Sequence, residues 1–144
     1  MIERSGQWWK GENFDDLVAY LREFTSQNYP AERFAQSRCG SCGGTTFSLE
    51  LDDEKGCARR KCDACGTSEF IGDSAEFLDE AQPGEAACPC GNESFELGVA
   101  FSLRSDGDIR WITVGARCTS CGVLGAYVDW KIDYSPTDHL LTAV

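Results

Sequence analysis

The chain has 144 residues, a formal net charge of -11, nine cysteines and a single histidine. Its content of 42% hydrophobic and 26% charged residues is close to that of ordinary globular proteins, which excludes wholesale disorder and fibrous repeats. The longest apolar stretches without a charge, such as residues 123–128, are far shorter than the roughly 20 residues that cross a bilayer, and the N-terminus lacks an apolar signal region. We therefore expect a cytoplasmic protein of one or two small domains.

The first expected element is an amphipathic helix near the N-terminus. Asn13 is a good N-cap residue, and acidic side chains follow in the first turn, where the helix dipole favours negative charge. Apolar residues then recur at helical spacing: Phe14, Leu17, Val18, Leu21 and Phe24. The helix should end before Tyr29-Pro30. Its apolar stripe is expected to cover the large side chains of residues 95–103.

Four closely spaced cysteine pairs follow, and they divide into two sets of four. The first set is Cys39, Cys42, Cys62 and Cys65, and the second is Cys88, Cys90, Cys118 and Cys121. An odd number of cysteines in a reducing compartment argues against a disulfide framework, whereas two thiolates from one tight turn can bind one metal ion. A glycine follows each pair, which allows the backbone of the turn to take a positive φ. The pattern predicts two metal sites with four thiolates each.

The two sets belong to an internal repeat. The run from Cys42 to Phe47 matches the run from Cys90 to Phe95, and residues 60–73 match residues 116–129 in the same order. Each copy is expected to form a β-hairpin between its cysteine pairs, followed by a third strand. The apolar patterns place strands at residues 47–51 and 69–71 in the first copy, and at residues 95–103, 109–114 and 124–132 in the second.

With these motifs the sequence resembles the zinc-ribbon class, in which two rubredoxin-like cysteine knuckles are joined by a β-hairpin with a third strand alongside. The resemblance covers residues 39–73 and 88–132, and it implies that the eight paired cysteines bind two structural Zn²⁺ ions. It also implies a small α+β fold, mostly β, with two tandem ribbons and the N-terminal helix. The expected segments are an N-terminal helical segment 1–38, a first ribbon 39–73, an acidic connector 74–87, and a second ribbon with a C-terminal tail 88–144.

The charge of the chain disfavours nucleic acid as a partner. The connector carries four acids and no base: Glu76, Asp79, Glu80 and Glu85. Eight thiolates and two divalent ions would add about four further negative charges. Nucleic-acid binding depends on the neutralisation of phosphates by Lys and Arg. The cluster Arg59-Arg60-Lys61 adjoins a cysteine pair, where we expect it to offset the thiolates rather than to bind phosphate.

The sequence contains no group of residues typical of an active site, and we expect that the protein is not an enzyme. The single histidine, His139, lies near the C-terminus, and a site with four thiolates has no open coordination position. Cys57, the one cysteine outside the pairs, is expected to be a small buried residue of a strand rather than a nucleophile.

Binding is therefore the expected function. Trp111 and Trp130 should lie in the core, whereas one of the adjacent Trp8 and Trp9 should be exposed or contact a partner. The sequence favours a non-catalytic, acidic, zinc-binding module for protein interaction, either an adaptor or a regulatory or immunity-type factor. Trp8, Trp9 and the connector acids would contact a basic protein. The alternatives are a transcription- or RNA-associated zinc ribbon and a rubredoxin-like electron carrier, in which four thiolates hold iron.

Overall fold

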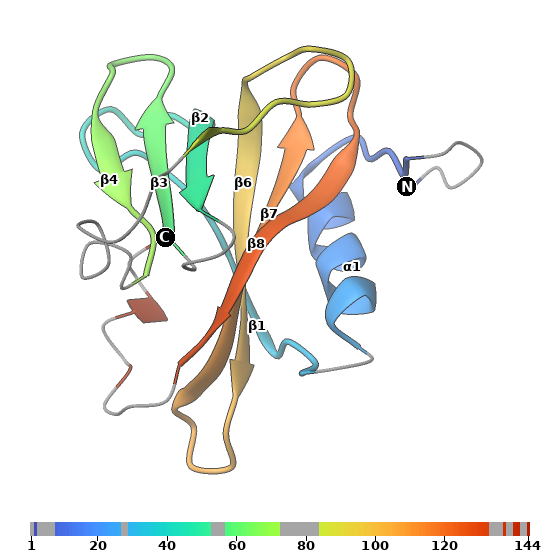
Figure 1. Ribbon diagram of the computed structural model, residues 1–144, viewed down its shortest axis with the longest axis vertical. Coiled ribbons are helices and arrows are strands. Elements are labelled where there is room, and N and C mark those ends of the chain that lie inside the picture. The colour runs from blue at the N-terminus through green and yellow to red at the C-terminus, as the bar shows by residue number, and fades with distance from the viewer. Residues whose placement is uncertain are drawn as a thin grey trace.

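The computed structural model describes residues 2, 8–26, 29–52, 57–72, 84–132, 137, 140–141 and 144. These residues form one helix, α1 (Phe14–Thr25), and one antiparallel sheet, which confirms the expected small, mostly β, α+β fold (Figure 1). The strands are β1 (Arg33–Gln36), β2 (Thr46–Asp52), β3 (Cys57–Cys62), β4 (Ser68–Phe70), β5 (Gly84–Glu85), β6 (Phe95–Leu103), β7 (Ile109–Cys118) and β8 (Leu124–Lys131). Among the described residues, no helix is long and apolar enough to span a membrane.

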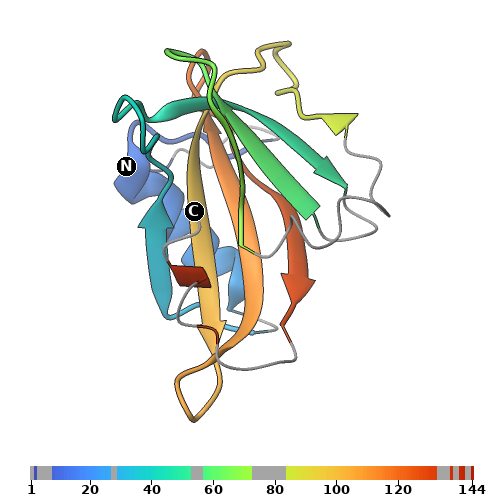
Figure 2. The same ribbon diagram turned by 90° about the vertical axis from the view of Figure 1, so that its left-hand side faces the viewer.

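The two copies of the internal repeat are joined into one sheet through their first strands. The strand order is β4-β3-β2-β6-β7-β8, with the short β1 paired to β6 and β5 paired to β2 (Figure 2). β2 and β6 pair in the register Thr46↔Glu96 and Phe47↔Phe95. Phe47 and Phe95 are equivalent positions of the internal repeat. The first strands of the two copies, β2 and β6, therefore lie in the centre of the sheet, and the third strands, β4 and β8, lie at its edges. An approximate twofold axis between β2 and β6 relates the two copies in this order.

The helix has the predicted bounds and the predicted cap. α1 spans Phe14–Thr25, and the Asn13 side chain accepts the backbone N–H of Asp16 at 3.0 Å. The Asp16 carboxylate in turn accepts the N–H of Glu12 at 2.8 Å. These bonds use N–H groups that have no partner within the helix. The hydrogen bond from Glu12 also lowers the pKa of Asp16.

The helix packs against the small residues of the sheet, so the expectation that it covers the large side chains of residues 95–103 is wrong. Leu17 and Leu21 are 0% and 1% exposed, and they lie against Gly98 and Gly115, which face each other across β6 and β7. A Cβ atom at Gly115 would lie 2.6 Å from Cδ2 of Leu21. The missing side chains therefore allow the helix to approach the sheet closely.

The large side chains of β6 lie on the other face of the sheet, in the main core. Those no more than 1% exposed are Phe95, Leu97, Val99 and Phe101, and they pack with Phe47 and Leu49 of β2 and with Leu140 near the C-terminus. Trp130 belongs to this core, as predicted. Trp111 does not: it is half-buried and stacks on Tyr29, with 5.0 Å between the ring centroids.

Candidate metal centres

Four tight turns carry the eight paired cysteines, and three of them have the same pattern of hydrogen bonds. In each of the three turns, the N–H of a glycine donates to the carbonyl of the first cysteine, which lies four residues before it, at 2.8 to 3.0 Å. The donor and acceptor residues are Gly43 and Cys39, Gly66 and Cys62, and Gly122 and Cys118. The N–H of the same first cysteine donates to the carbonyl five residues on. These glycines have φ between 76° and 80°, a region that side chains disfavour.

The Cys88-Pro89-Cys90 turn keeps this pattern with each bond shorter by one residue. The N–H of Gly91 donates to the carbonyl of Cys88 at 2.8 Å, and the N–H of Cys88 donates to the carbonyl of Asn92 at 2.9 Å. Gly91 has a φ of 94°. The shorter spacing therefore forms a tighter turn of the same design, with both cysteines of the pair still directed to one site.

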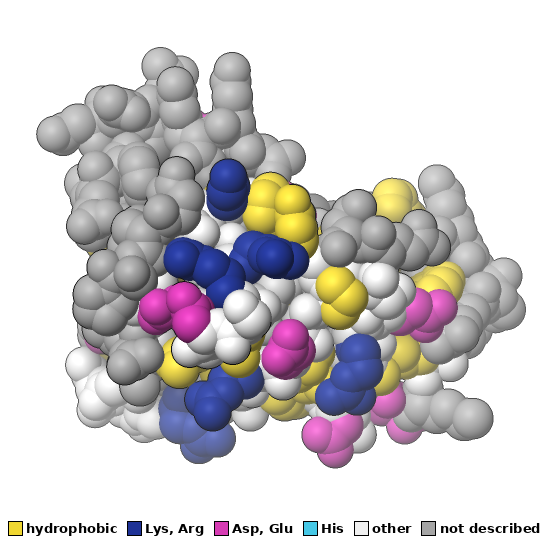
Figure 3. All heavy atoms as spheres, turned by 90° about the horizontal axis from the view of Figure 1, so that it is seen from below, with side chains coloured by type: hydrophobic (Ala, Val, Ile, Leu, Met, Phe, Trp, Pro, Cys, Tyr) yellow, Lys and Arg dark blue, Asp and Glu magenta, His cyan; other side chains and the backbone are white. Residues whose placement is uncertain are grey.

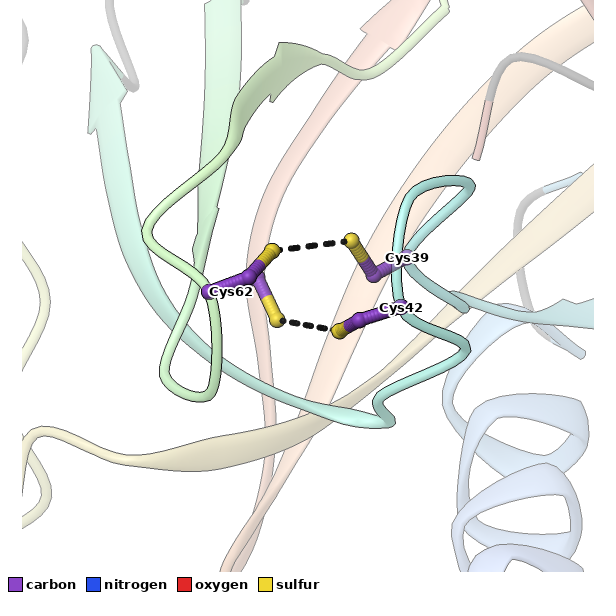
Figure 4. Close-up of side chains that lie close together, drawn as sticks. Cys39, Cys42 and Cys62 are labelled. Atoms are coloured by element: carbon purple, nitrogen blue, oxygen red, sulfur yellow. Dashed lines mark hydrogen bonds between the residues drawn. The ribbon is translucent and has the colours of Figure 1, made fainter.

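The turns gather the cysteines into the two groups of four that the spacing predicts. Within each group all four sulfur atoms lie within 4.8 Å of one another: Cys39, Cys42, Cys62 and Cys65 form one group, and Cys88, Cys90, Cys118 and Cys121 form the other. In Figure 4 the side chains of Cys39 and Cys42 point toward the facing turn that carries Cys62.

The distances between the sulfur atoms suit a tetrahedral metal ion. They are 3.5 Å for Cys39–Cys65, 3.5 Å for Cys42–Cys62, 3.4 Å for Cys88–Cys121 and 3.7 Å for Cys90–Cys118. Four sulfurs bound at about 2.3 Å in a tetrahedron are about 3.8 Å apart. A disulfide would require about 2.05 Å. The residues therefore fit a metal ion with four thiolate ligands at either site.

Backbone and side-chain N–H groups point at several of the sulfurs. The Nδ2 group of Asn92 donates to Sγ of Cys118 at 3.2 Å, and the N–H of Cys121 reaches the same sulfur at 3.5 Å. Such donors favour a charged thiolate over a neutral thiol. Sequence reasoning missed Asn92. In the repeat it aligns with Gly44, where an added Cβ atom would lie 3.2 Å from Sγ of Cys62 and would crowd that sulfur.

Each group contains one thiol that ionises easily. Hydrogen bonds between Cys65 and the side chain and backbone of Thr67 lower the pKa of Cys65 to about 6. Burial raises the pKa of Cys118, but the Cys121 amide and Asn92 outweigh it and lower this pKa to about 6. In the first group the Gly44 amide favours the Cys42 thiolate, yet the neighbouring thiols raise the pKa of Cys42 to about 12. Burial raises the pKa of Cys88 and of Cys121 in the second group. A metal ion must therefore displace the protons of Cys42, Cys88 and Cys121 when it binds.

Both sites lie at the same end of the sheet, opposite the β6–β7 turn (Figure 1). A row of paired residues across β3, β2, β6 and β7 connects them, in the order Cys62, Phe47, Phe95 and Cys118. All four are at most 1% exposed. Three strand spacings of about 4.8 Å separate the ends of the row, or about 14 Å. The two sites thus border one shared part of the core.

Of the predicted partner-contact residues that the structure describes, Trp8 lies beside the second site, because Pro89 of the Cys88-Pro89-Cys90 turn lines the same hollow. Trp8 is 49% exposed, whereas Trp9 is half-buried with its ring edge-on to Tyr20 at 5.8 Å between centroids. Glu85 is exposed on β5. Glu76, Asp79 and Glu80 lie outside the described residues, as does His139. Cys57 is 1% exposed on β3 and belongs to neither group, in agreement with its predicted place in a strand.

The basic cluster next to the first site is largely engaged with carboxylates. Arg59 pairs with Glu50 at 2.5 Å, and Arg60, whose side chain is 4% exposed, pairs with Glu69 at 2.8 Å. Arg60 also donates to the carbonyl of Val144 at 3.0 Å and lies 4.6 Å from the ring centroid of Phe47. The local charge partners of these arginines are therefore acids, rather than the thiolates that we expected.

Comparisons with protein-family models, with curated proteins and with solved structures found no match for this chain.

Proposed function

We propose that this protein is a non-catalytic module that binds two structural Zn²⁺ ions and interacts with a basic protein, as an adaptor or as a regulatory or immunity-type factor. The observation that carries the proposal is the pair of four-cysteine groups with sulfur separations close to those of a tetrahedral ion. Four thiolates saturate zinc and leave no position for a substrate, so the ions would stabilise the fold.

The charges of the chain support a protein partner over nucleic acid. The net charge of -11 repels phosphate and steers cationic partners toward the surface. Arg59 and Arg60 already pair with carboxylates, and Arg117 pairs with Glu96 at 2.6 Å. Three of the arginines near the sites are thus engaged within the chain, which limits what they can offer to a phosphate backbone.

Trp8 offers an apolar contact for such a partner. It lines a hollow of about 320 Å³ together with Tyr20, Pro89 and Tyr127. An exposed tryptophan beside a hollow is typical of the residues that contribute most to protein interfaces. The acids of the connector, including the exposed Glu85, would raise the rate of association with a basic partner.

The metal content tests the first half of the proposal. Elemental analysis of the purified full chain should find two zinc ions per chain. One ion would contradict binding at the second set, with its shorter knuckle. Dominant iron with a red colour would replace this proposal by the electron carrier.

Binding to defined partners tests the second half. The zinc-loaded chain should bind an immobilised basic protein but neither duplex DNA nor structured RNA at roughly physiological salt, where non-specific phosphate contacts are weak. Replacement of Glu76, Asp79, Glu80 and Glu85 by Gln should slow association and flatten its salt dependence. Glu93→Gln, at an exposed position beside the second site, is the control for a single lost charge. Tight binding to nucleic acid would favour the RNA-associated ribbon instead.

A further inference from the structure

A cavity of about 130 Å³ lies between the C-terminal end of α1 and the sheet. Three aromatic side chains, two threonines and one carboxylate line this aromatic pocket: Phe24, Tyr29, Trp111, Thr25, Thr113 and Asp129. Its volume equals that of about four water molecules at about 30 Å³ each. The pocket is therefore large enough for the end of an alkyl side chain, and too small for a cofactor.

The aromatic wall of the pocket suits a cation. Tyr29 and Trp111 stack with an interplanar angle of 21°, and Phe24 is 47% exposed on the helix side. The guanidinium of Arg110 already lies 5.0 Å from the ring centroid of Tyr29. The faces of aromatic rings carry partial negative charge and attract ammonium and guanidinium groups. The rings of Phe24 and Trp111 thus offer a second cation the same kind of contact.

The polar wall of the pocket contains hydrogen-bond acceptors that no other described residue uses. Thr113 is 2% exposed and lines the pocket, and its hydroxyl makes no hydrogen bond to another described residue. Asp129 faces Thr113 across β7 and β8, and within the described part of the chain its carboxylate makes no ion pair or hydrogen bond. Thr25 differs, because its hydroxyl donates to the carbonyl of Leu21 and accepts the N–H of Ala31. Thr113 and Asp129 are therefore available to a donor that enters the pocket.

The surroundings of the pocket do not favour an anion. Figure 3, which views this end of the molecule, shows Lys and Arg side chains with Asp and Glu side chains between them. Arg110 and Lys131 adjoin the pocket, but Glu32, Asp108 and Asp129 lie at the same end. The bases are thus balanced by acids, and among the described residues the lining has a carboxylate as its only charged group. A phosphate would meet that carboxylate, whereas a cation would be held by it.

We propose that the aromatic pocket binds the alkylammonium group of a lysine side chain that the partner protein presents. The lysine methylenes pack against Phe24 and Trp111, and the ammonium donates to the Asp129 carboxylate and the Thr113 hydroxyl. This inference rests on the proposed function for the identity of the partner. The pocket itself can be tested without it.

The test is a titration of the zinc-loaded full chain with n-butylammonium chloride, at an ionic strength held constant with sodium chloride. The indole N–H signal of Trp111 in the NMR spectrum should shift in a saturable way, while that of Trp130, in the core on the opposite face, stays in place. The neutral analogue n-butanol should produce less than a tenth of the effect. No saturable shift, or an equal effect of n-butanol, would overturn the proposal.

Variants identify the groups responsible. Asp129→Asn should weaken n-butylammonium binding about two- to fivefold, the range of a solvent-exposed ion pair. Phe24→Ala, on the exposed side of the helix, should weaken it about two- to tenfold through the lost cation–π contact. Glu32→Gln removes the same charge from an exposed position at the same end and should leave the affinity unchanged. Equal affinities of Asp129→Asn and Glu32→Gln would contradict the assignment.

The pocket and the proposed function fail in different ways. If n-butylammonium does not bind while the basic protein still does, the pocket assignment is wrong and the proposed function stands. If n-butylammonium binds with the expected variant pattern and no basic protein binds, the pocket stands and the partner is wrong. When both bind, acetylation of the lysines of the basic protein should weaken its binding to the wild-type chain by a larger factor than its binding to Asp129→Asn, which keeps the connector acids but lacks the carboxylate of the pocket.

Discussion

Gly115→Ala should destabilise the protein by forcing the helix away from the sheet. The new Cβ atom would lie 2.6 Å, 2.9 Å and 3.0 Å from Cδ2, Cδ1 and Cγ of Leu21. Carbon atoms pack at about 3.5–4.0 Å, so either Leu21 or the helix must move by about 1 Å. Gly115 does not have a positive φ, which means that the backbone itself tolerates alanine. Overpacking of this kind costs about 1–3 kcal/mol of unfolding free energy.

A double-variant cycle shows whether the contact with Leu21 causes the loss. Leu21→Ala alone should cost about 2–5 kcal/mol because the side chain is 1% exposed. In the double variant the methyl group introduced by Gly115→Ala enters the space that Leu21 leaves. The combined cost should therefore fall below the sum of the single costs by about 1–2 kcal/mol, within the range for residues in contact.

Urea unfolding of the zinc-loaded variants, followed by circular dichroism, measures these differences. Gly84→Ala is the matched control, since Gly84 also lies on a strand, has no positive φ and, among the described residues, has no atom within 4 Å of an added Cβ. The free energy of unfolding of Gly84→Ala should stay within about 0.5 kcal/mol of the wild-type value. A wild-type stability of Gly115→Ala, or strict additivity with Leu21→Ala, would refute the packing of the helix on the small-residue face.

Three further predictions concern the cap, the ligands and the protons. Asn13→Ala should lower the free energy of unfolding by about 1 kcal/mol, or the thermal midpoint by about 3 °C, whereas Asn13→Asp should keep the wild-type stability because aspartate also caps a helix. Cys62→Ser should lower the zinc content by one ion per chain, whereas Cys57→Ser should leave two; loss of metal in the second variant would mean that the ligands are misassigned. The pKa values of Cys65 and Cys118 are about 6, so each of these thiols is already ionised above pH 6. Below pH 6 the zinc ion must displace the proton of this thiol as well. Zinc binding at pH 8 should then release protons from the thiols whose pKa is raised, Cys42, Cys88 and Cys121, and zinc affinity should fall more steeply with acid below pH 6. Calorimetry in buffers of different ionisation enthalpy counts these protons.

The metal sites could be predicted from sequence because they depend on local backbone geometry. A cysteine pair followed by glycine determines its own turn, and both turns of each site reach the same end of a hairpin. Even the short Cys88-Pro89-Cys90 knuckle keeps the local design. Asn92 could not be found in this way, because nothing in its spacing shows that its amide reaches the Cys118 sulfur.

The packing of the helix could not be predicted because it depends on contacts between distant segments. The alternation in β6 separates large residues such as Phe101 from small ones such as Gly98, and an apolar helix stripe fits against either face on hydrophobicity alone. The face on which the helix packs is decided by which other segments cover the face with the large side chains. β2, β3 and the C-terminal Leu140 occupy it, and their positions follow from a strand pairing between the copies that no local motif encodes.

That pairing explains why the duplicated chain should behave as one folding unit. Phe47 and Phe95 face each other between the two copies, and each is 0% exposed. A separated ribbon would expose its phenylalanine, at a cost of about 1.5–3 kcal/mol for each buried side chain returned to water. Because Cys62 and Cys118 flank this pair in the same row, a metal ion bound at either site would hold one end of a core that both copies share. Loss of one ion should therefore weaken the other ribbon as well as its own.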